Sequence, residues 1–335
     1  MKVLVTGGTG FIGSHSVAAL LSQGHQVRLL VRSRDRVARS LSPLGVADVE
    51  SVLGDVTAPG SVEQAMAGCD AALHCAAIFS YDARAAARMR EVNVRGAEIV
   101  LGAAVRAGLD PIVHVSSYVA LLPPSGAVLT PDSRVKRPHG AYSRSKAESE
   151  QVARRYQEQG APVVITYPGG VIGPHDPYLG ESDRTIAEFA TSGVTMRGGG
   201  SWVDVRDVAK VHAAVMEPGR GPRRYMITGH YIALPDLTAM LREIAGHPGR
   251  IVVVPAGAAK AIGRMADLVQ HIVPGRVPLG YEGMWIAALQ PHCDDSRTVQ
   301  ELGITPRELR VTLADTVRWL ADQGHLSLTR AQEAA

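Results

Sequence analysis

The stretch KVLVTGGTGFIG, residues 2–13, decides the fold of this chain. Lys2–Thr6 is a short apolar run typical of a strand, and apolar residues recur at helical spacing from Phe11 onward. Between them lie Gly7, Gly10 and Gly13, in the spacing GxxGxxG rather than GxGxxG. A glycine loop between strand and helix lets the backbone turn sharply and aims free N–H groups at an anion. We therefore predict a dinucleotide-binding loop; a plain tight turn is the alternative.

Strand-like and helix-like segments alternate from this loop to about residue 167. Further strands are predicted at 26–31, 49–53, 71–74, 112–115 and 163–167, and helices at 11–22, 61–67, 85–107 and 141–159. The strands are continuous apolar runs, as in parallel sheets that are covered on both faces. The expected fold class is α/β, with a Rossmann-type doubly wound parallel sheet.

The pattern changes after Pro168, where glycine and proline become frequent and residues 168–177 are predicted to form a loop. Later segments predict helices at 185–192, 235–245, 284–291 and 309–323, a helix or strand-then-helix at 203–215, and a strand at 224–228. We expect a dinucleotide-binding domain at 1–173, completed by 201–232. A smaller C-terminal substrate lobe would comprise 174–200 and 233–330, with a loosely held tail from Ser327.

Composition excludes several classes of protein. The 335 residues carry a formal net charge of +3, with acidic and basic residues interspersed, so nucleic-acid binding is not expected. No metal-ligand spacing occurs, and an odd count of three cysteines suggests a reducing compartment with Cys69 and Cys75 buried. No stretch of about 18 apolar residues is present, so no membrane span is expected. The predicted location is the cytosol.

The end of the second strand bears on the choice of cofactor. A carboxylate there would bind the ribose hydroxyl of NAD(H), but the strand ends in Val31-Arg32, with Arg34 close by and no acid before Asp35. Arginines pair well with a 2′-phosphate, so NADP(H) is preferred and NAD(H) is the alternative. Asp55 is a candidate for the adenine amino group, or an ordinary turn aspartate. The other cofactor contacts predicted in this half of the chain are Thr9, Phe11, Ile12, Val56, Cys75, Ala76 and Ala77.

A possible proton-transfer group lies near the fifth strand. Tyr142 and Lys146 are four residues apart and therefore share one face of a helix. A free phenol has a pKa of about 10, and a nearby ammonium favours the phenolate and lowers that pKa. The same lysine is placed to hold the nicotinamide ribose, and the Ser117 hydroxyl to hold a substrate oxygen. The alternative is an exposed Tyr–Lys pair on a solvated helix.

The motifs TGGTGFIG, HCAA, VSS, YSRSK and PGGVIGP occur in an order that resembles the extended short-chain dehydrogenase/reductases, in the epimerase/dehydratase superfamily. They cover about the first 175 residues, and VDVRDVA at 203–209 resembles a later element of the family. The resemblance implies that Ser117, Tyr142 and Lys146 are catalytic, with Ser116 as the other candidate serine. It implies that Asn93 organises the lysine and a water. It also implies that Pro168, Gly170 and Val171 contact the nicotinamide amide, and that a homodimer is possible.

Departures from the family pattern narrow the substrate. Tyr118 and Val119 stand where sugar-nucleotide dehydratases carry acids, and the Gln-x-Arg of sugar-nucleotide epimerases is missing before Val203. The Val-Arg end of the second strand resembles dihydroflavonol-reductase-like enzymes. The function expected is NADP(H)-dependent reduction of a small apolar ketone or aldehyde. Alternatives are a sugar epimerase, a 3β-hydroxysteroid-dehydrogenase-like enzyme and a non-catalytic NADP sensor. Aromatic residues that could line an apolar pocket, or be plain core, are Phe79, Tyr81, Tyr118, Tyr178 and Trp202.

Overall fold

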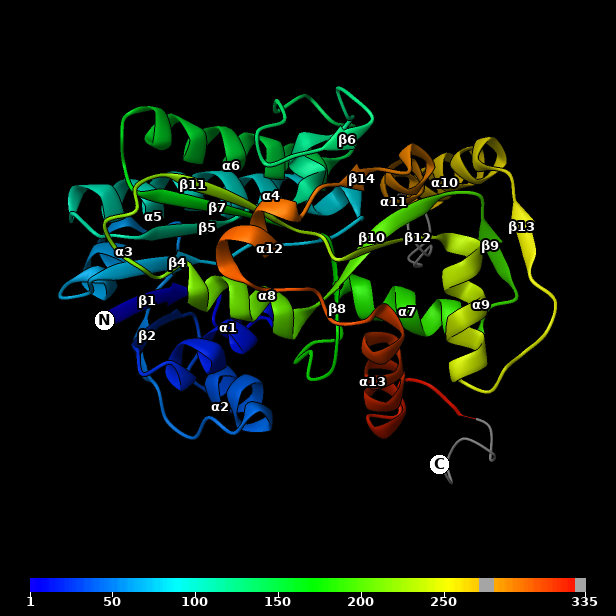
Figure 1. The fold of residues 1–335 in the computed structure, drawn as a ribbon, viewed down its shortest axis with the longest axis horizontal. Coiled ribbons are helices and arrows are strands. Elements are labelled where there is room, and N and C mark those ends of the chain that lie inside the picture. Colours follow the sequence, from blue (N-terminus) through cyan, green and yellow to red (C-terminus); the bar gives the residue numbers. More distant parts are fainter. Residues whose placement is uncertain (271–279, 329–335) are drawn as a thin grey trace.

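The structure is a computed structural model that describes residues 1–270 and 280–328. A seven-stranded parallel sheet forms its centre, in the order β11-β7-β5-β4-β1-β2-β3 (Figure 1). Its strands are β1 (Lys2–Thr6), β2 (Gln26–Val31), β3 (Glu50–Leu53), β4 (Ala71–His74), β5 (Ile112–Val115), β7 (Val163–Pro168) and β11 (Arg223–Ile227). The strand order reverses direction at β1, which confirms the doubly wound fold.

Helices cover both faces of this sheet because alternate strand residues point to opposite sides. Leu4 belongs to the core beneath α3 (Pro59–Met66), α5 (Gly96–Arg106) and α6 (Ala141–Glu158). Val3 and Val5 belong to the core beneath α1 (Phe11–Ser22), α2 (Asp35–Leu41) and α8 (Val205–Ala214). Figure 1 shows α5 and α6 on one side of the sheet and α1, α2 and α8 on the other. Before α5 lie α4 (Ala86–Met89) and the π-helical η3 (Arg90–Arg95).

A smaller group of elements lies beyond the carboxyl ends of the strands (Figure 1). Its strands are β8 (Gly170–Ile172), β10 (Gly199–Asp204) and β12 (His230–Ala233), and the paired β9 (Val194–Met196) and β13 (Val252–Val254). Its helices are α7 (Glu181–Thr191), α9 (Leu234–Ile244), α10 (Ala256–Gln270), α11 (Gly280–Leu289) and α13 (Leu309–Asp322). Ile186, Leu237 and Leu313 join α7, α9 and α13 in a third core. The remaining elements named in the text are short. They are the paired strands β6 (Val128–Leu129) and β14 (His292–Cys293), the 3-10 turn η4 (Tyr118–Leu121) and α12 (Ser296–Leu302).

Two sequence expectations are corrected by the structure. The predicted loop 168–177 contains the last residue of β7 and all of β8, and β8 pairs with β10 through Gly170 and Trp202. A three-residue strand that begins with glycine carries no periodic signal, so it was hidden among the glycines and prolines. Cys75 is half-buried rather than buried, because it borders the cavities described below, while Cys69 is buried as expected.

Two segments lie outside the described residues. They are residues 329–335 of the tail that was expected to be loosely held, and residues 271–279 before α11. All three cysteines are free. Within residues 1–270 and 280–328, no helix is both long and apolar enough to cross a membrane.

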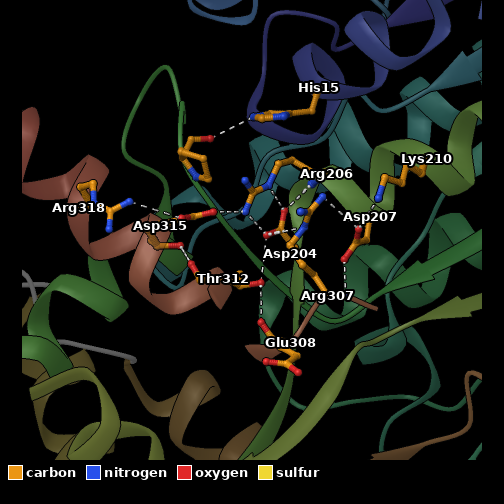
Figure 2. Close-up of polar contacts among 12 residues, drawn as sticks. His15, Asp204, Arg206, Asp207, Lys210, Arg307, Glu308, Thr312, Asp315 and Arg318 are labelled. Atoms are coloured by element: carbon orange, nitrogen blue, oxygen red, sulfur yellow. Dashed lines mark hydrogen bonds and ion pairs between the residues drawn. The ribbon is translucent and has the colours of Figure 1, made fainter. Parts of the chain in front are cut away.

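An ion-pair network joins the two groups of elements (Figure 2). Asp204, the last residue of β10, accepts a hydrogen bond from the Arg206 backbone N–H (2.8 Å) and caps α8. The Arg206 guanidinium pairs with Asp204 (2.6 Å) and with Asp315 of α13 (2.7 Å). Thr312 of α13 also donates to Asp204 (3.0 Å). The network therefore holds α13 against the start of α8.

Candidate active site

Two adjoining cavities lie at the carboxyl ends of the central strands, where parallel α/β sheets bind ligands. The main cavity has a volume of about 380 Å³. Its described lining includes Gly10, Phe11, Ile12, Gly13, Phe79, Tyr81, Ser116, Ser117, Tyr118, Tyr142, Lys146, Pro168, Gly170, Val171, Tyr178, Trp202, Gly283, Ile286 and Ala287. Gly7, Gly10, Cys75, Ala77 and Tyr178 line both cavities, so the two form one continuous groove.

The second cavity, of about 240 Å³, extends from the glycine loop toward β2 and β3. Its described lining includes Thr9, Val31, Arg32, Arg36, Gly54, Asp55, Val56, Ala76 and Ile78. The predicted adenosine-end contacts Thr9, Arg32, Asp55, Val56 and Ala76 are therefore brought together in one place. Asp55 also makes a turn, because its carboxylate accepts hydrogen bonds from the Thr57 N–H (2.9 Å) and hydroxyl (2.8 Å).

The glycine loop is shaped as a cradle for a phosphate group. Gly7 has φ +72°, and a Cβ at this position would lie 2.6 Å from the Ala76 nitrogen. A Cβ on Gly13 would overlap the Gly7 carbonyl oxygen. The Gly10 N–H donates to that same oxygen (2.9 Å), and α1 begins at the next residue. Only glycine permits this close packing, and the start of α1 then faces the junction of the two cavities.

Arginine placement differs in one respect from the sequence expectation. Arg32 lines the second cavity as predicted, but Arg34 borders a separate pocket on the far side of α2. The second arginine that lines this cavity is Arg36, and its guanidinium lies 5.5 Å from the ring centre of Tyr178. The reason is helical geometry: α2 begins at Asp35, and the helical turn directs Arg36 back toward the loop. This helix was not predicted, so Arg36 was missed.

The Tyr–Lys pair and Ser117 meet in the main cavity. Tyr142 and Lys146 lie one turn apart on α6, and Ser117 follows the end of β5. The Ser117 hydroxyl donates weakly to the Pro168 carbonyl oxygen (3.4 Å). Buried Lys146 donates to the Val115 carbonyl oxygen (2.8 Å). Strand ends and one helix thus place a phenol, a hydroxyl and an ammonium around one space.

The electrostatics of this group differ from the expected lowering of the phenol pKa. Burial raises the pKa of Tyr142, the charge of Glu282 raises it further, and a hydrogen bond with Ser117 acts in the opposite direction. Burial lowers the pKa of Lys146 to about 8, although Glu150 and Cys75 oppose that change. The phenol is therefore held in its neutral, proton-donating form, and Lys146 is the group that titrates near neutrality.

Ser116 and Asn93 occupy different kinds of position. Ser116 lines the main cavity, and its hydroxyl oxygen is buried and has no hydrogen-bond partner among the described residues. Asn93 lines neither cavity; its side-chain amide instead bonds the Ile78 N–H (2.7 Å), the Ile78 carbonyl oxygen (2.9 Å) and the Ser145 hydroxyl (2.9 Å). Asn93 thereby fixes the loop after β4 to α6, next to the turn that carries Lys146.

Aromatic side chains form the walls of the main cavity. All five that the sequence suggested, Phe79, Tyr81, Tyr118, Tyr178 and Trp202, line it, and Tyr118 is also part of the buried core. The Phe79 ring lies 4.4 Å from the ring of Tyr142, centre to centre. Among the described lining residues the only charged side chains are Lys146, Asp176 and Glu181, and none is an arginine. The cavity thus suits an uncharged, mostly apolar molecule.

One comparison decides the family. The model of the NAD dependent epimerase/dehydratase family matches residues 3–228, which include the glycine loop, Ser117, Tyr142 and Lys146. The chain belongs to this epimerase/dehydratase family. As a member of the family it is an NAD(P)-dependent oxidoreductase that acts on carbonyl or hydroxyl groups, as the sequence motifs predicted.

Relatives in the epimerase/dehydratase family match nearly the whole chain. Sterol demethylase protein B of Methylococcus capsulatus is 31% identical, over 97% of this chain and 99% of its own. A putative dihydroflavonol 4-reductase of Synechocystis is 33% identical, over 96% and 95%. The structure of the dTDP-glucose 4,6-dehydratase DesIV from Streptomyces venezuelae, with NAD bound, is 27% identical and superimposes with a TM-score of 0.76 over 97% and 99% of the two chains.

Proposed function

We propose that this protein is an NADP(H)-dependent reductase of a ketone or aldehyde on a small, largely apolar substrate. The observation that carries the proposal is the main cavity: Ser117 and Tyr142 meet in it, its walls are aromatic, and its described lining has no arginine. A nucleotide sugar would bring a diphosphate, which arginines usually bind. The names of two relatives also fit, since sterols and dihydroflavonols are uncharged ring systems without a diphosphate.

The cavities suit a nicotinamide dinucleotide. The glycine cradle would hold the pyrophosphate, Asp55 and Val56 would border the adenine, and Arg32 with Arg36 would pair with a 2′-phosphate. Pro168, Gly170 and Val171 would contact the nicotinamide amide. When bound, NADPH supplies the hydride for the carbonyl carbon.

The protein's own residues then act on the carbonyl oxygen. Ser117 holds that oxygen beside the phenol, and Tyr142 donates its proton to it, so that the carbonyl becomes an alcohol. Lys146 holds the ribose and offers positive charge to the phenolate that remains. Asn93 supports this turn of α6 through Ser145. We further propose that 1–173 with 201–232 forms the cofactor domain, that 174–200 with 233–330 selects the substrate, and that the enzyme works in the cytosol.

Cofactor binding tests this proposal. We expect NADPH to bind at least about tenfold more tightly than NADH, as suits a charge-assisted pair between arginines and a phosphate. Arg32→Ala and Arg36→Ala should remove that preference. Arg34→Ala is the matched control, because Arg34 lies outside the second cavity, and it should leave the preference unchanged. Tighter binding of NADH, or a cofactor that co-purifies and never turns over, would instead favour the alternative function, that of a sugar epimerase.

A further inference from the structure

Helix α6, which carries Tyr142 and Lys146, lacks a cap of its own. The residue before it is Gly140, with φ +94°, no capping side chain, and no acidic residue in the first turn. The first N–H groups of a helix have no partner within the helix and require an acceptor from elsewhere.

Glu282, from α11, supplies that acceptor across 140 residues of sequence. Its carboxylate accepts hydrogen bonds from the Tyr142 N–H (3.2 Å), the Ser143 N–H (2.6 Å) and the Ser143 hydroxyl (2.6 Å). Its side chain is almost wholly buried, at 6% exposed. A Cβ on residue 140 would overlap the Glu282 carboxyl group, so Gly140 is needed for the approach as well as for its positive φ.

The same helix, α11, forms part of the substrate wall. Gly283, Ile286 and Ala287 line the main cavity immediately after Glu282 in sequence. Trp285 and Ile286 belong to the core against which Tyr142 packs. Helix α11 therefore contacts both the space for the substrate and the turn that bears the proposed proton donor.

We propose that Glu282 is a positioning residue: its buried carboxylate fixes the first turn of α6 and keeps the Tyr142 phenol in place as a neutral proton donor. This inference rests on the proposed function for its catalytic consequence. The geometry itself, a carboxylate from the substrate wall bound to the backbone of Tyr142, stands without it.

The charges around Tyr142 support this role. Lys146 lies one turn along α6, and Tyr81 and Tyr118 face the phenol from the loop after β4 and from η4. Glu282 is the acidic group whose charge raises the pKa of Tyr142. Burial raises the pKa of Glu282, and its bonds to the Ser143 hydroxyl and to the N–H groups of the first turn lower it again. A helix N-terminus favours a carboxylate in its charged form.

The test compares Glu282→Gln with a matched control, Asp295→Asn. Asp295 is a half-buried carboxylate that likewise accepts hydrogen bonds from two backbone N–H groups (2.7 and 2.8 Å, from Thr228 and Gly229) and from one hydroxyl (2.6 Å, from Thr228). It does not line either cavity among the described residues. Both variants lose one carboxylate charge that binds backbone N–H groups, and only Glu282→Gln should alter Tyr142.

Two readouts separate this inference from the proposed function. The first is direct titration of the tyrosines by NMR of ¹³C-tyrosine protein, with Tyr142 assigned through Tyr142→Phe. Glu282→Gln should lower the pKa of Tyr142 by about half a unit or more, since a like charge nearby disfavours the phenolate. This readout needs no substrate, so it judges Glu282 even if no carbonyl compound is reduced.

The second readout is the steady-state rate of NADPH-driven reduction. In Glu282→Gln, kcat should fall several-fold, with the dissociation constant of NADPH within about twofold of wild type. Glu282→Asp, which keeps the charge, should keep the pKa of Tyr142 while lowering kcat. A Tyr142 titration unchanged in Glu282→Gln, or shifted equally in Asp295→Asn, would overturn the proposal.

If Glu282→Gln does not fold, Ser143→Ala provides the comparison. It removes one hydroxyl donor to Glu282 and nothing that lines the main cavity among the described residues. The proposal then requires kcat to fall several-fold with NADPH affinity unchanged, and an unaltered kcat contradicts it.

Discussion

The ammonium group of Lys146 donates a 2.8 Å hydrogen bond to the carbonyl oxygen of Val115, the last residue of β5. The lysine is 4% exposed, and burial lowers its pKa to about 8. This contact ties the ammonium group to the end of β5, the strand that leads to Ser117. A charged lysine in this position costs stability, which gives a prediction about pH.

Lys146 should make the stability of the protein depend on pH. The pKa is about 8 in the fold, against an ordinary value of 10.5, so the unfolded chain binds more protons between these two pH values. Stability therefore rises with pH across this window. Relative to Lys146→Met, the wild type should gain about 3 kcal/mol in free energy of unfolding, which is the pKa difference expressed as energy. Urea unfolding of both proteins at several pH values measures this; parallel curves would contradict it.

The glycine cradle predicts a specific loss of cofactor binding. Gly7→Ala forces a side chain against the Ala76 backbone, at a residue with φ +72°. We expect NADPH affinity to fall at least about tenfold, together with about 1–2 kcal/mol of backbone strain. Gly24→Ala is the control, because Gly24 has φ +80° but open space around it. It should show the strain without the loss of affinity in calorimetric titrations, and equal losses in both variants would refute the cradle.

The network around Asp204 predicts a destabilised variant. Arg206→Ala leaves the fully buried Asp204 carboxylate without its main partner, and we expect a loss of about 3 kcal/mol at neutral pH. Burial raises the pKa of Asp204, but Arg206 and Thr312 outweigh burial and hold it below its ordinary 3.8. The stabilisation is thus present above that pH and is lost as the pH falls through the lower, folded value.

Denaturant unfolding at neutral and acidic pH checks this account. The difference between wild type and Arg206→Ala should shrink under acid. Arg318→Ala is the control, since Arg318 is 71% exposed and lies 3.9 Å from Asp315 (Figure 2); it should cost under about 0.5 kcal/mol. A loss as small in Arg206→Ala would show that the network does not hold α13.

The first half of the fold was predictable because its signals are local. The run Lys2–Thr6 and the helical spacing after Phe11 gave the observed bounds of β1 and α1, since buried parallel strands and amphipathic helices differ in period. Ser117 was expected beside Tyr142 because it follows the fifth strand and because the motifs resemble those of the family, and both residues line the main cavity.

The remaining parts of the site depend on tertiary contacts. Arg36 enters the second cavity only because the short helix α2 turns it inward, and Glu282 reaches α6 from α11. Neither residue belongs to a sequence motif. Burial also reversed one expectation. The sequence places Lys146 beside Tyr142, and the lysine was expected to lower the pKa of the phenol. In the structure, burial and the charge of Glu282 raise the pKa of Tyr142 instead.

The most direct test of the central claim is the rate of NADPH oxidation with a panel of apolar ketones and aldehydes, for the wild type and for Tyr142→Phe. The wild type should consume NADPH with at least one carbonyl compound and release the alcohol. Tyr142→Phe should lose at least about 100-fold in kcat, as expected for a positioned general acid, while its NADPH affinity stays within about threefold. A Tyr142→Phe enzyme that reduces the same substrate at the native rate would contradict the account.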